Sequence, residues 1–135
     1  RKGWDGLESL LRRAFVVMPN SAELELLVGI KDYRKGATLL LNRGVDVVAV
    51  KLGIGGCYVA NANENHLIES FRVKAVDTTG AGDAFCAGFL YGLISLRNLY
   101  DCGRIGNFVA SRCIMKMGAR AGLPRLKDLA ANKLV

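Results

Sequence analysis

Runs and spacings of hydrophobic residues along the chain predict an alternation of strands and helices. The runs at 14–18 and 45–51 are short, continuous and apolar, which predicts buried strands. Two further strands are predicted at 57–60 and around 67–73, on either side of a polar turn. The short turns that precede and separate these later strands predict an antiparallel hairpin beyond the first two.

Apolar residues at helical spacing predict helices before, between and after the strands. The predicted helices cover residues 4–14, 20–28, 32–42, 81–96, 99–116 and 126–133. Gly44 follows the third of them and suits a helix C-terminus. Helices that alternate with strands indicate an α/β fold, with a parallel sheet and helices on both of its faces. Ligands of such sheets bind at the carboxyl ends of the strands.

Composition limits the class of protein. With 135 residues, 51% of them hydrophobic, the chain can form one domain with a core. No apolar run approaches the roughly 18 residues of a membrane span. The four cysteines form no C-x-x-C pair and lie in mostly apolar stretches, which favours reduced core residues of a cytoplasmic protein. His66 is the only histidine, so a histidine-rich metal cluster is excluded, and its polar surroundings predict a surface position.

The net charge of +7 allows an interaction with nucleic acid. The basic residues are scattered, however, and the 7% of aromatic residues do not interleave with them as a stacking platform would. A basic surface that attracts a polyanionic nucleotide is therefore the better interpretation. A basic nucleic-acid-binding domain remains a minority alternative.

The segment 77–85, Asp-Thr-Thr-Gly-Ala-Gly-Asp-Ala-Phe, is the most informative part of the chain. Gly80 and Gly82 allow close approach of the backbone to a ligand, and the start of the following helix favours an anion. Asp83 would repel a bound phosphate, but it could take a proton from a hydroxyl that attacks the phosphate. The segment therefore predicts a phosphoryl-transfer site. An ordinary glycine-rich turn would explain the glycines, but not Asp83 or the two threonines.

Two other nucleotide motifs do not fit this segment. A dinucleotide fingerprint needs a third glycine where the chain has Phe85, and a Walker loop needs a closing Gly-Lys-Ser/Thr. The segment instead resembles the D-T-T/V-G-A-G-D-x-F signature of the ribokinase-like (PfkB) carbohydrate kinases. The resemblance implies a three-layer αβα, Rossmann-like fold and ATP-dependent phosphorylation of a sugar or nucleoside hydroxyl. It also implies that Asp83 is the catalytic base, beside an anion hole of N–H groups around Gly80, Ala81 and Gly82.

The resemblance covers the whole chain but only the C-terminal half of the family pattern. We therefore expect a single nucleotide-binding and catalytic portion over residues 1–135, without the N-terminal sugar-binding and lid portion. The isolated chain is expected to be inactive or weakly active. A non-catalytic nucleotide-binding or regulatory module is the alternative. ATP or ADP and a sugar or nucleoside are the expected partners, without nucleic acid or membrane, and a homodimer of the full-length parent is a further option.

Other residues match the family pattern more weakly. Asn20 and Glu23 fit its P-N-x-x-E element, which implies that they organise Mg²⁺, partly through water. The same two residues also fit a capping box, and the two roles are compatible. By resemblance Lys51, Gly53 and Gly56 line the nucleotide, although a glycine-rich hairpin with a solvated lysine explains them equally well.

The remaining matches lie in and after the central signature. By resemblance Thr79 and Gly82 contact the nucleotide, and Asn107 lies beside its purine. The partner of a buried Asn107 could also be backbone. Asp77 and Thr79, with the loop 118–124, are implied to hold a monovalent cation, commonly K⁺.

Overall fold

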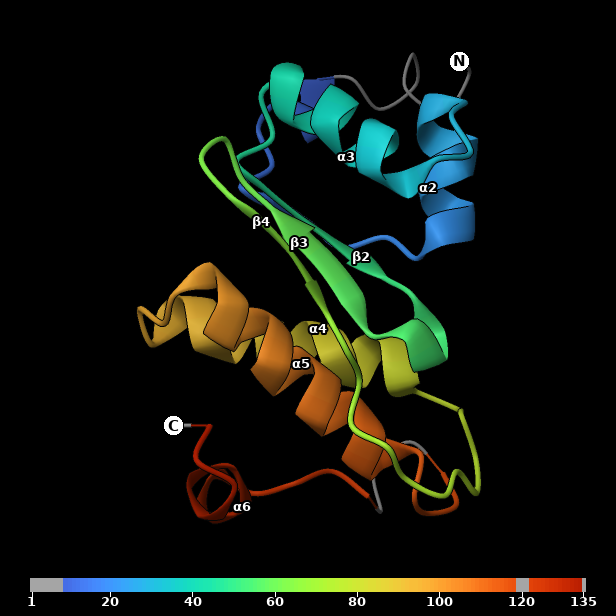
Figure 1. The fold of residues 1–135 in the computed structure, drawn as a ribbon, viewed down its shortest axis with the longest axis vertical. Coiled ribbons are helices and arrows are strands. Elements are labelled where there is room, and N and C mark those ends of the chain that lie inside the picture. Colours follow the sequence, from blue (N-terminus) through green and yellow to red (C-terminus); the bar gives the residue numbers. More distant parts are fainter. Residues whose placement is uncertain (1–8, 119–121, 135) are drawn as a thin grey trace. The chain divides into compact units, whose positions relative to one another are not determined.

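The computed structural model describes residues 9–118 and 122–134. These residues form two compact units (Figure 1). The first unit runs to Gly53 and includes Cys57–Leu67, and the second contains Ile54–Gly56 and the residues from Ile68 onward. Each unit has its own elements and its own set of predicted site residues.

The first unit is built on a four-stranded sheet. Its strands are β1 (Val16–Val17), β2 (Val47–Lys51), β3 (Cys57–Ala60) and β4 (Asn65–Ile68), in the order β1-β2-β3-β4. β1 pairs with β2 in parallel, and β2 pairs with β3 in antiparallel fashion. The predicted combination of a parallel pair and an antiparallel hairpin is confirmed.

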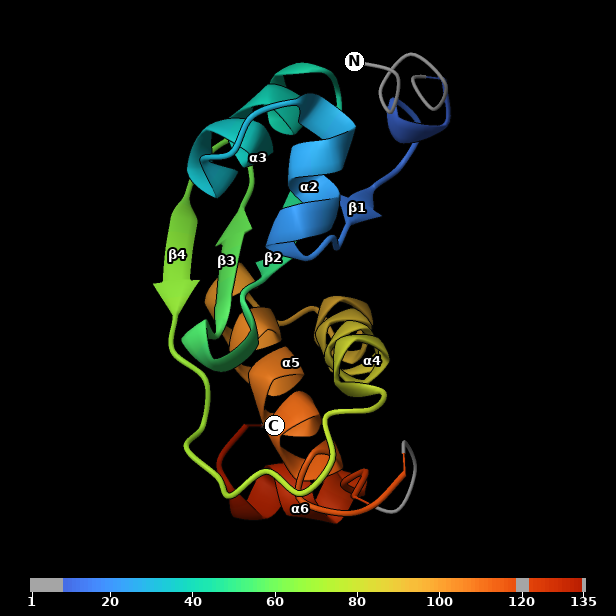
Figure 2. The same cartoon turned by 90° about the vertical axis from the view of Figure 1, so that its right-hand side faces the viewer.

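Two helices cover one face of this sheet, α2 (Ser21–Val28) and α3 (Tyr33–Asn42) (Figure 2). Their buried side chains form one core with alternate residues of β2 and β3, because alternate residues of a strand face the same side. This core contains Leu24, Val28, Ala37, Leu40, Val48, Val50, Tyr58 and Ala60. The packing of α2 and α3 against the sheet holds β1 and β2 in place, and with them the residues at the ends of these strands.

The second unit contains the helices α4 (Ala81–Ile94), α5 (Leu99–Cys113) and α6 (Leu126–Ala131). α4 and α5 approach each other closely at glycines. A Cβ on Gly88 would lie 2.9 Å from the Ile105 carbonyl oxygen, and one on Gly106 would lie 2.6 Å from the Phe85 ring. Larger residues would push the helices apart, so this contact holds the first turn of α4 in place.

Two predicted elements differ from the structure. The strand expected around 67–73 lies at 65–68. Beyond it the chain runs along α5, where the Phe71 ring meets the Phe108 ring edge-on at 5.4 Å. Packing against this helix outweighs the β propensity of the segment. α5 was predicted to continue to 116 but ends at Cys113, and the next carbonyl, of Ile114, accepts the Val76 N–H at 2.7 Å.

The remaining predicted elements are found, β3 at its predicted bounds and the others with shorter bounds. Of the helix predicted over 4–14, residues 9–11 are helical, and residues 4–8 lie outside the described part. Gly44 follows α3 with a φ of 111°, as its predicted role at the helix end requires. The three-layer arrangement concerns both units together and stays a prediction.

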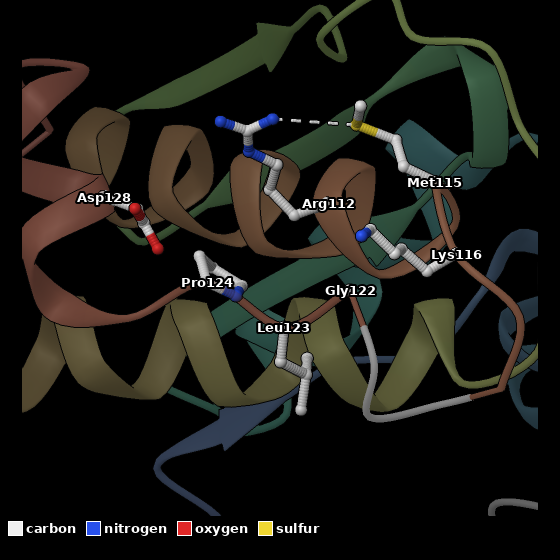
Figure 3. A pocket seen from close by; sticks show the side chains of 7 residues that line it. All are labelled: Arg112, Met115, Lys116, Gly122, Leu123, Pro124 and Asp128. Atoms are coloured by element: carbon white, nitrogen blue, oxygen red, sulfur yellow. Dashed lines mark hydrogen bonds between the residues drawn. The ribbon is translucent and has the colours of Figure 1, made fainter.

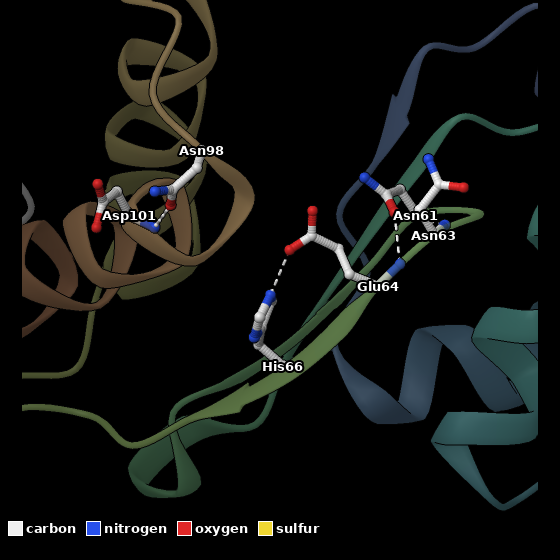
Figure 4. Close-up of polar contacts among 6 residues, drawn as sticks. All are labelled: Asn61, Asn63, Glu64, His66, Asn98 and Asp101. Carbon is white, nitrogen blue, oxygen red and sulfur yellow. Dashed lines mark hydrogen bonds and ion pairs between the residues drawn. The ribbon is translucent and has the colours of Figure 1, made fainter.

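The cysteines and the histidine lie as expected. Cys57, Cys102 and Cys113 are buried and Cys86 is half-buried, and none forms a disulfide in the described structure. His66 lies on β4 at the surface, where its Nε2 is 2.6 Å from Glu64 Oε1 (Figure 4). Over the described residues, no helix is both long and apolar enough to cross a membrane.

Candidate active site

The segment before α4 is fixed by a carboxylate, that of Asp77. Its Oδ1 accepts the Thr79 N–H at 2.9 Å, and its Oδ2 accepts the Gly118 N–H at 3.0 Å. The Thr79 hydroxyl, followed by the N–H groups of Gly118 and Thr79, lowers the pKa of the Asp77 carboxyl from 3.8 to about 2. Asp77 is therefore ionised near neutral pH, and it ties the turn to the chain beyond α5.

The turn ends at Gly80, which is the N-cap of α4. Its φ of 80° lies in the left-handed region, where a Cβ is unfavourable. Without a side chain, Gly80 cannot cap the helix as Asn or Ser would. The first N–H groups of α4 therefore have no side-chain acceptor at the cap.

The predicted anion hole would be formed by backbone N–H groups at this turn. The Ala81 N–H donates to the Thr78 carbonyl in a long bond of 3.2 Å, and its part in an anion hole stays a prediction. Among the described residues, the N–H groups of Gly80, Gly82 and Asp83 have no acceptor. A helix start with open donors and the positive end of the dipole can bind an anion.

Asp83 is the third residue of α4 and is exposed. Its carboxylate accepts no hydrogen bond from the described residues. The next two residues, Ala84 and Phe85, are buried and hold this turn against the rest of the unit. An acid in the first turn gains some stability from the helix dipole, but none of the described residues pairs with this carboxylate. The arrangement leaves the carboxylate accessible to a substrate hydroxyl.

In the first unit, Asn20 and Glu23 form a complete capping box at the start of α2. Asn20 Oδ1 accepts the Glu23 N–H at 2.7 Å, and Glu23 Oε1 accepts the Asn20 N–H at 2.8 Å. The capping role left open by the sequence is therefore present. Lys51 lies beside them, because Asn20 and Lys51 form a parallel bridge and the Lys51 N–H donates to the Pro19 carbonyl at 2.8 Å. The three residues meet where β1 and β2 end.

Two further predicted residues have structural reasons for their identity. Gly56 has a φ of 88°, and a Cβ there would lie 1.9 Å from the Ile68 carbonyl oxygen. Asn107 is buried, and its amide donates to the carbonyls of Ile68 at 3.1 Å and Glu69 at 3.0 Å. The backbone alternative for the Asn107 partner is therefore the one found. Gly53 opens a short 3₁₀ turn with a φ of 61°, a left-handed conformation that favours glycine, although a Cβ there would meet nothing within 4 Å.

The structure brings the predicted residues together in two groups. Asn20, Glu23, Lys51 and Gly53 belong to the first unit, and Gly56, Asp77, Thr79, Gly80, Ala81, Gly82, Asp83 and Asn107 belong to the second. Within the second unit, the segment 77–83 forms one continuous turn and helix start. Asn107 and Gly56 instead both contact the chain around Ile68.

Comparison with known proteins identifies the family to which the chain belongs. A family model described as pfkB family carbohydrate kinase matches residues 2–126. The chain belongs to the PfkB family of carbohydrate kinases. A protein described only as an uncharacterized sugar kinase, from Archaeoglobus fulgidus, is 45% identical over 127 residues, which are 94% of this chain and 50% of that protein.

Solved structures of other sugar kinases share the fold. One, named as a candidate ribokinase II from E. coli in complex with ATP and Mg²⁺, has a TM-score of 0.86 and 28% identity over 94% of this chain and 41% of its own. Another is a fructokinase from Vibrio cholerae with fructose, ADP and a calcium ion, with a TM-score of 0.82 and 29% identity over 94% and 44%. The fold is ribokinase-like α/β, as predicted. The chain spans half or less of the length of these relatives, and its assignment to the C-terminal half of the family pattern stays a prediction.

The residues of this PfkB chain fit one kind of magnesium site. No group of three or more His, Cys, Asp or Glu side chains that could hold a metal occurs among the described residues. Glu23 is exposed, and one of its oxygens is taken by the Asn20 N–H. Such a pair suits a Mg²⁺ ion held mainly by phosphates and water, and it does not suit a cage made of protein ligands.

One residue that contacts the turn, Cys113, was not predicted from the sequence. Its thiol donates to the Thr79 carbonyl at 3.5 Å, so the end of α5 supports the turn. Burial, and then the charge of Asp77, raise the pKa of this thiol. The sequence marks Cys113 only as one more apolar helix position, and nothing in its spacing indicates this contact.

A hollow of about 170 Å³ lies elsewhere in the second unit, near the end of α5 (Figure 3). It is lined by Arg112, Met115, Lys116, Gly122, Leu123, Pro124 and Asp128. Two of these residues are linked, because Arg112 Nη1 donates to the Met115 sulfur at 3.7 Å. Gly122, Leu123 and Pro124 belong to the loop that is implied to hold a monovalent cation, but none of the residues predicted to act in catalysis or to bind the nucleotide or Mg²⁺ lines this hollow.

Proposed function

We propose that this chain carries the nucleotide site and the catalytic base of an ATP-dependent sugar or nucleoside kinase. Membership of the PfkB family supports the reaction class. The relatives crystallised with ATP and Mg²⁺ or with ADP and fructose support nucleotide and sugar as substrates. The observation that carries the proposal is the start of α4, where N–H donors without an acceptor and an exposed carboxylate without a partner, both judged among the described residues, occur together.

Each residue of this turn has a role in the proposed reaction. Asp83 accepts the proton of the acceptor hydroxyl as its oxygen attacks the γ-phosphoryl group, while the bond from the γ-phosphorus to the oxygen of the β-phosphate breaks and ADP leaves. The N–H groups of Gly80 and Gly82 donate to the phosphoryl oxygens as negative charge develops on them. The Ala81 N–H can join them if its long bond to Thr78 opens. Asp77 orients the turn through Thr79, and it remains a candidate ligand for a monovalent cation.

The first unit would act on the nucleotide and its metal. Mg²⁺, when bound, neutralises charge on the nucleotide phosphates. Asn20 and Glu23 would orient its water ligands from the start of α2, while their capping bonds hold both side chains in place. Lys51 lies next to Asn20 and would add positive charge near the phosphates.

Nucleotide binding tests the proposal on the chain itself. Isothermal titration with MgADP should detect binding with a dissociation constant on the order of 1 mM or tighter. A coupled ADP-release assay with sugars and nucleosides should stay at background, because accurate positioning of the acceptor supplies much of the rate. A folded chain that gives no heat at saturating MgADP would contradict the proposal.

A further inference from the structure

Two polar side chains of α5, those of Asn107 and Ser111, are buried in the described structure. They are 3% and 5% exposed. The Ser111 hydroxyl donates to the Phe108 carbonyl at 2.7 Å, so its hydrogen bond stays within its own helix. The Asn107 amide instead donates to a segment that lies 38 and 39 residues earlier in the chain. A buried polar group that reaches so far fixes the path of the segment that it holds.

Both hydrogens of the Asn107 amide are used on this segment. Nδ2 donates to the Ile68 carbonyl at 3.1 Å and to the Glu69 carbonyl at 3.0 Å. These carbonyls lie at the end of β4 and just beyond it, where pairing within the sheet stops. Because two carbonyl oxygens can be satisfied only by the two N–H bonds of the amide, Asn107 has no donor left for a purine. We call residues 68–70 the support segment.

The support segment in turn holds the glycine turn between β2 and β3. The Ser70 hydroxyl donates to the Ile54 carbonyl at 2.9 Å. Gly56 lies against the same segment, since a Cβ there would overlap the Ile68 carbonyl oxygen and would lie 2.8 Å from the Ser70 nitrogen. All of these residues belong to the second unit. A continuous series of contacts therefore leads from Asn107 through the support segment to the turn.

We propose that Asn107 is a positioning residue for the nucleotide, which holds the turn 53–56 in its binding shape through the support segment and does not read the purine. This proposal rests on the proposed function, in which Gly53 and Gly56 line the nucleotide. A direct contact between the Asn107 amide and the purine is the competing account. The two accounts differ in whether the effect of Asn107 passes through Ser70 and the turn.

Nucleotide titration tests the role with a matched pair of variants. Asn107→Ala leaves the two carbonyls of the support segment without their donor, so the turn should loosen and the MgADP affinity should fall about tenfold. Ser111→Ala removes the other buried polar side chain of α5 and should keep the ADP affinity, because its hydrogen bond lies within the helix. Melting temperatures report the stability that each variant loses. An unchanged ADP affinity in a folded Asn107→Ala chain would overturn the proposal.

Ser70→Ala reaches the same turn without disturbing the core. It removes the hydrogen bond to the Ile54 carbonyl and should weaken MgADP binding about threefold. In the double variant with Asn107→Ala the two losses should not multiply, because both act through one turn. Losses that multiply, or a Ser70→Ala chain with unchanged affinity, would contradict the proposal. Should Asn107→Ala fail to fold, the affinity of Ser70→Ala decides.

The base of the nucleotide supplies a readout that a direct contact would move. A positioning role predicts that Asn107→Ala weakens the binding of MgADP and of MgGDP by the same factor, since the turn would lie along both nucleotides. A loss confined to MgADP would show that Asn107 reads the base, and the proposal would be wrong.

Hydrogen exchange follows the turn without any nucleotide. Amide exchange in a peptide that covers residues 53–57 should become faster in Asn107→Ala and in Ser70→Ala, and should stay unchanged in Ser111→Ala. Unchanged exchange in a folded Asn107→Ala chain would overturn the proposal by itself. If exchange becomes faster but the unsubstituted chain binds no MgADP, the proposed function fails and the nucleotide role of Asn107 with it, while its hold on the turn stands.

Discussion

The two long helices of the second unit begin in different ways. Both carry an aspartate as their third residue, Asp83 in α4 and Asp101 in α5. At α5, the Asn98 side chain accepts the Asp101 N–H at 2.8 Å (Figure 4). At α4, the cap is Gly80, and the Asp83 N–H has no acceptor among the described residues. The same unit thus contains one helix whose first N–H groups are capped by a side chain and one whose first N–H groups have no side-chain cap.

The two helix starts differ little in stability but differ in their capacity to bind an anion. A glycine in place of Asn at a helix start lowers the stability by only a few tenths of a kcal/mol. Because glycine has no side-chain acceptor, the backbone N–H groups stay available to an anion. The start of α5 has a sufficient explanation in its Asn98 cap, whereas under the proposed function the open donors after Gly80 and the carboxylate of Asp83 serve a ligand. The predictions below test whether this contrast is real.

The largest effect on folding is expected at Gly80. Gly80→Ala places a Cβ in the left-handed region, which costs about 1–2 kcal/mol, and it should weaken MgADP binding because the turn must shift. Gly29→Ala is the matched control, since Gly29 ends α2 with a φ of 74°. It should lose similar stability and keep its ADP affinity. Equal ADP affinity in both variants, by titration, would remove the special role of the Gly80 turn.

Removal of the α5 cap should affect stability alone. Asn98→Ala leaves the Asp101 N–H without its acceptor and should reduce the free energy of unfolding by about 1 kcal/mol. Asn98→Ser should restore most of the loss. Urea unfolding measures both changes, and titration should find unchanged ADP affinity. A loss of affinity as large as that of Gly80→Ala would mean that the two helix starts are not functionally different.

The support of the turn by Asp77 should be visible at acidic pH. Because its pKa in the folded chain, about 2, lies below the ordinary 3.8, the ionised carboxyl stabilises the fold. This stabilisation is complete above pH 3.8 and is lost as the pH falls towards 2. As the pH is lowered from 5 to 2, the melting temperature of the Asp77→Asn chain should therefore fall less than that of the unsubstituted chain. Parallel melting curves would contradict the assignment.

The smallest expected effects are those of the two aspartates on stability. Asp101→Asn and Asp83→Asn each remove one charge from the third residue of a helix. Each should cost a few tenths of a kcal/mol at low salt, and less at high salt. A loss well above 1 kcal/mol for Asp83→Asn alone, in urea unfolding, would reveal a structural role for this carboxylate.

The fold could be predicted where local pattern decides it. The apolar runs of β1 and β2, the capping box of Asn20, and Asp32, whose side chain accepts the Arg34 N–H at 2.9 Å at the start of α3, are local features that determine strands and helices with little help from distant residues. The segment after Ile68 could not be predicted, because its path depends on Phe108 and Ile114 of a helix that comes much later in the sequence.

The site could be predicted in part for a similar reason. The position of Asp83 at the start of a helix follows from the glycines before it. The hydrogen bonds of Asp77 with Gly118 and of Cys113 with Thr79 join residues far apart in the sequence, so no local pattern predicts them. Gly56 and Asn107 show the opposite case, in which residues assigned to the nucleotide by resemblance also have contacts with the backbone around Ile68.

The most direct test of the central claim is the turnover of Asp83→Asn in a catalytically competent PfkB kinase that contains this chain. Asn keeps the shape of the side chain but cannot accept the hydroxyl proton, so kcat should fall by roughly 10²–10⁴-fold. Nucleotide affinity and melting temperature should hardly change, and Asp101→Asn should retain normal kcat. A near-normal kcat for Asp83→Asn would contradict its assignment as the base.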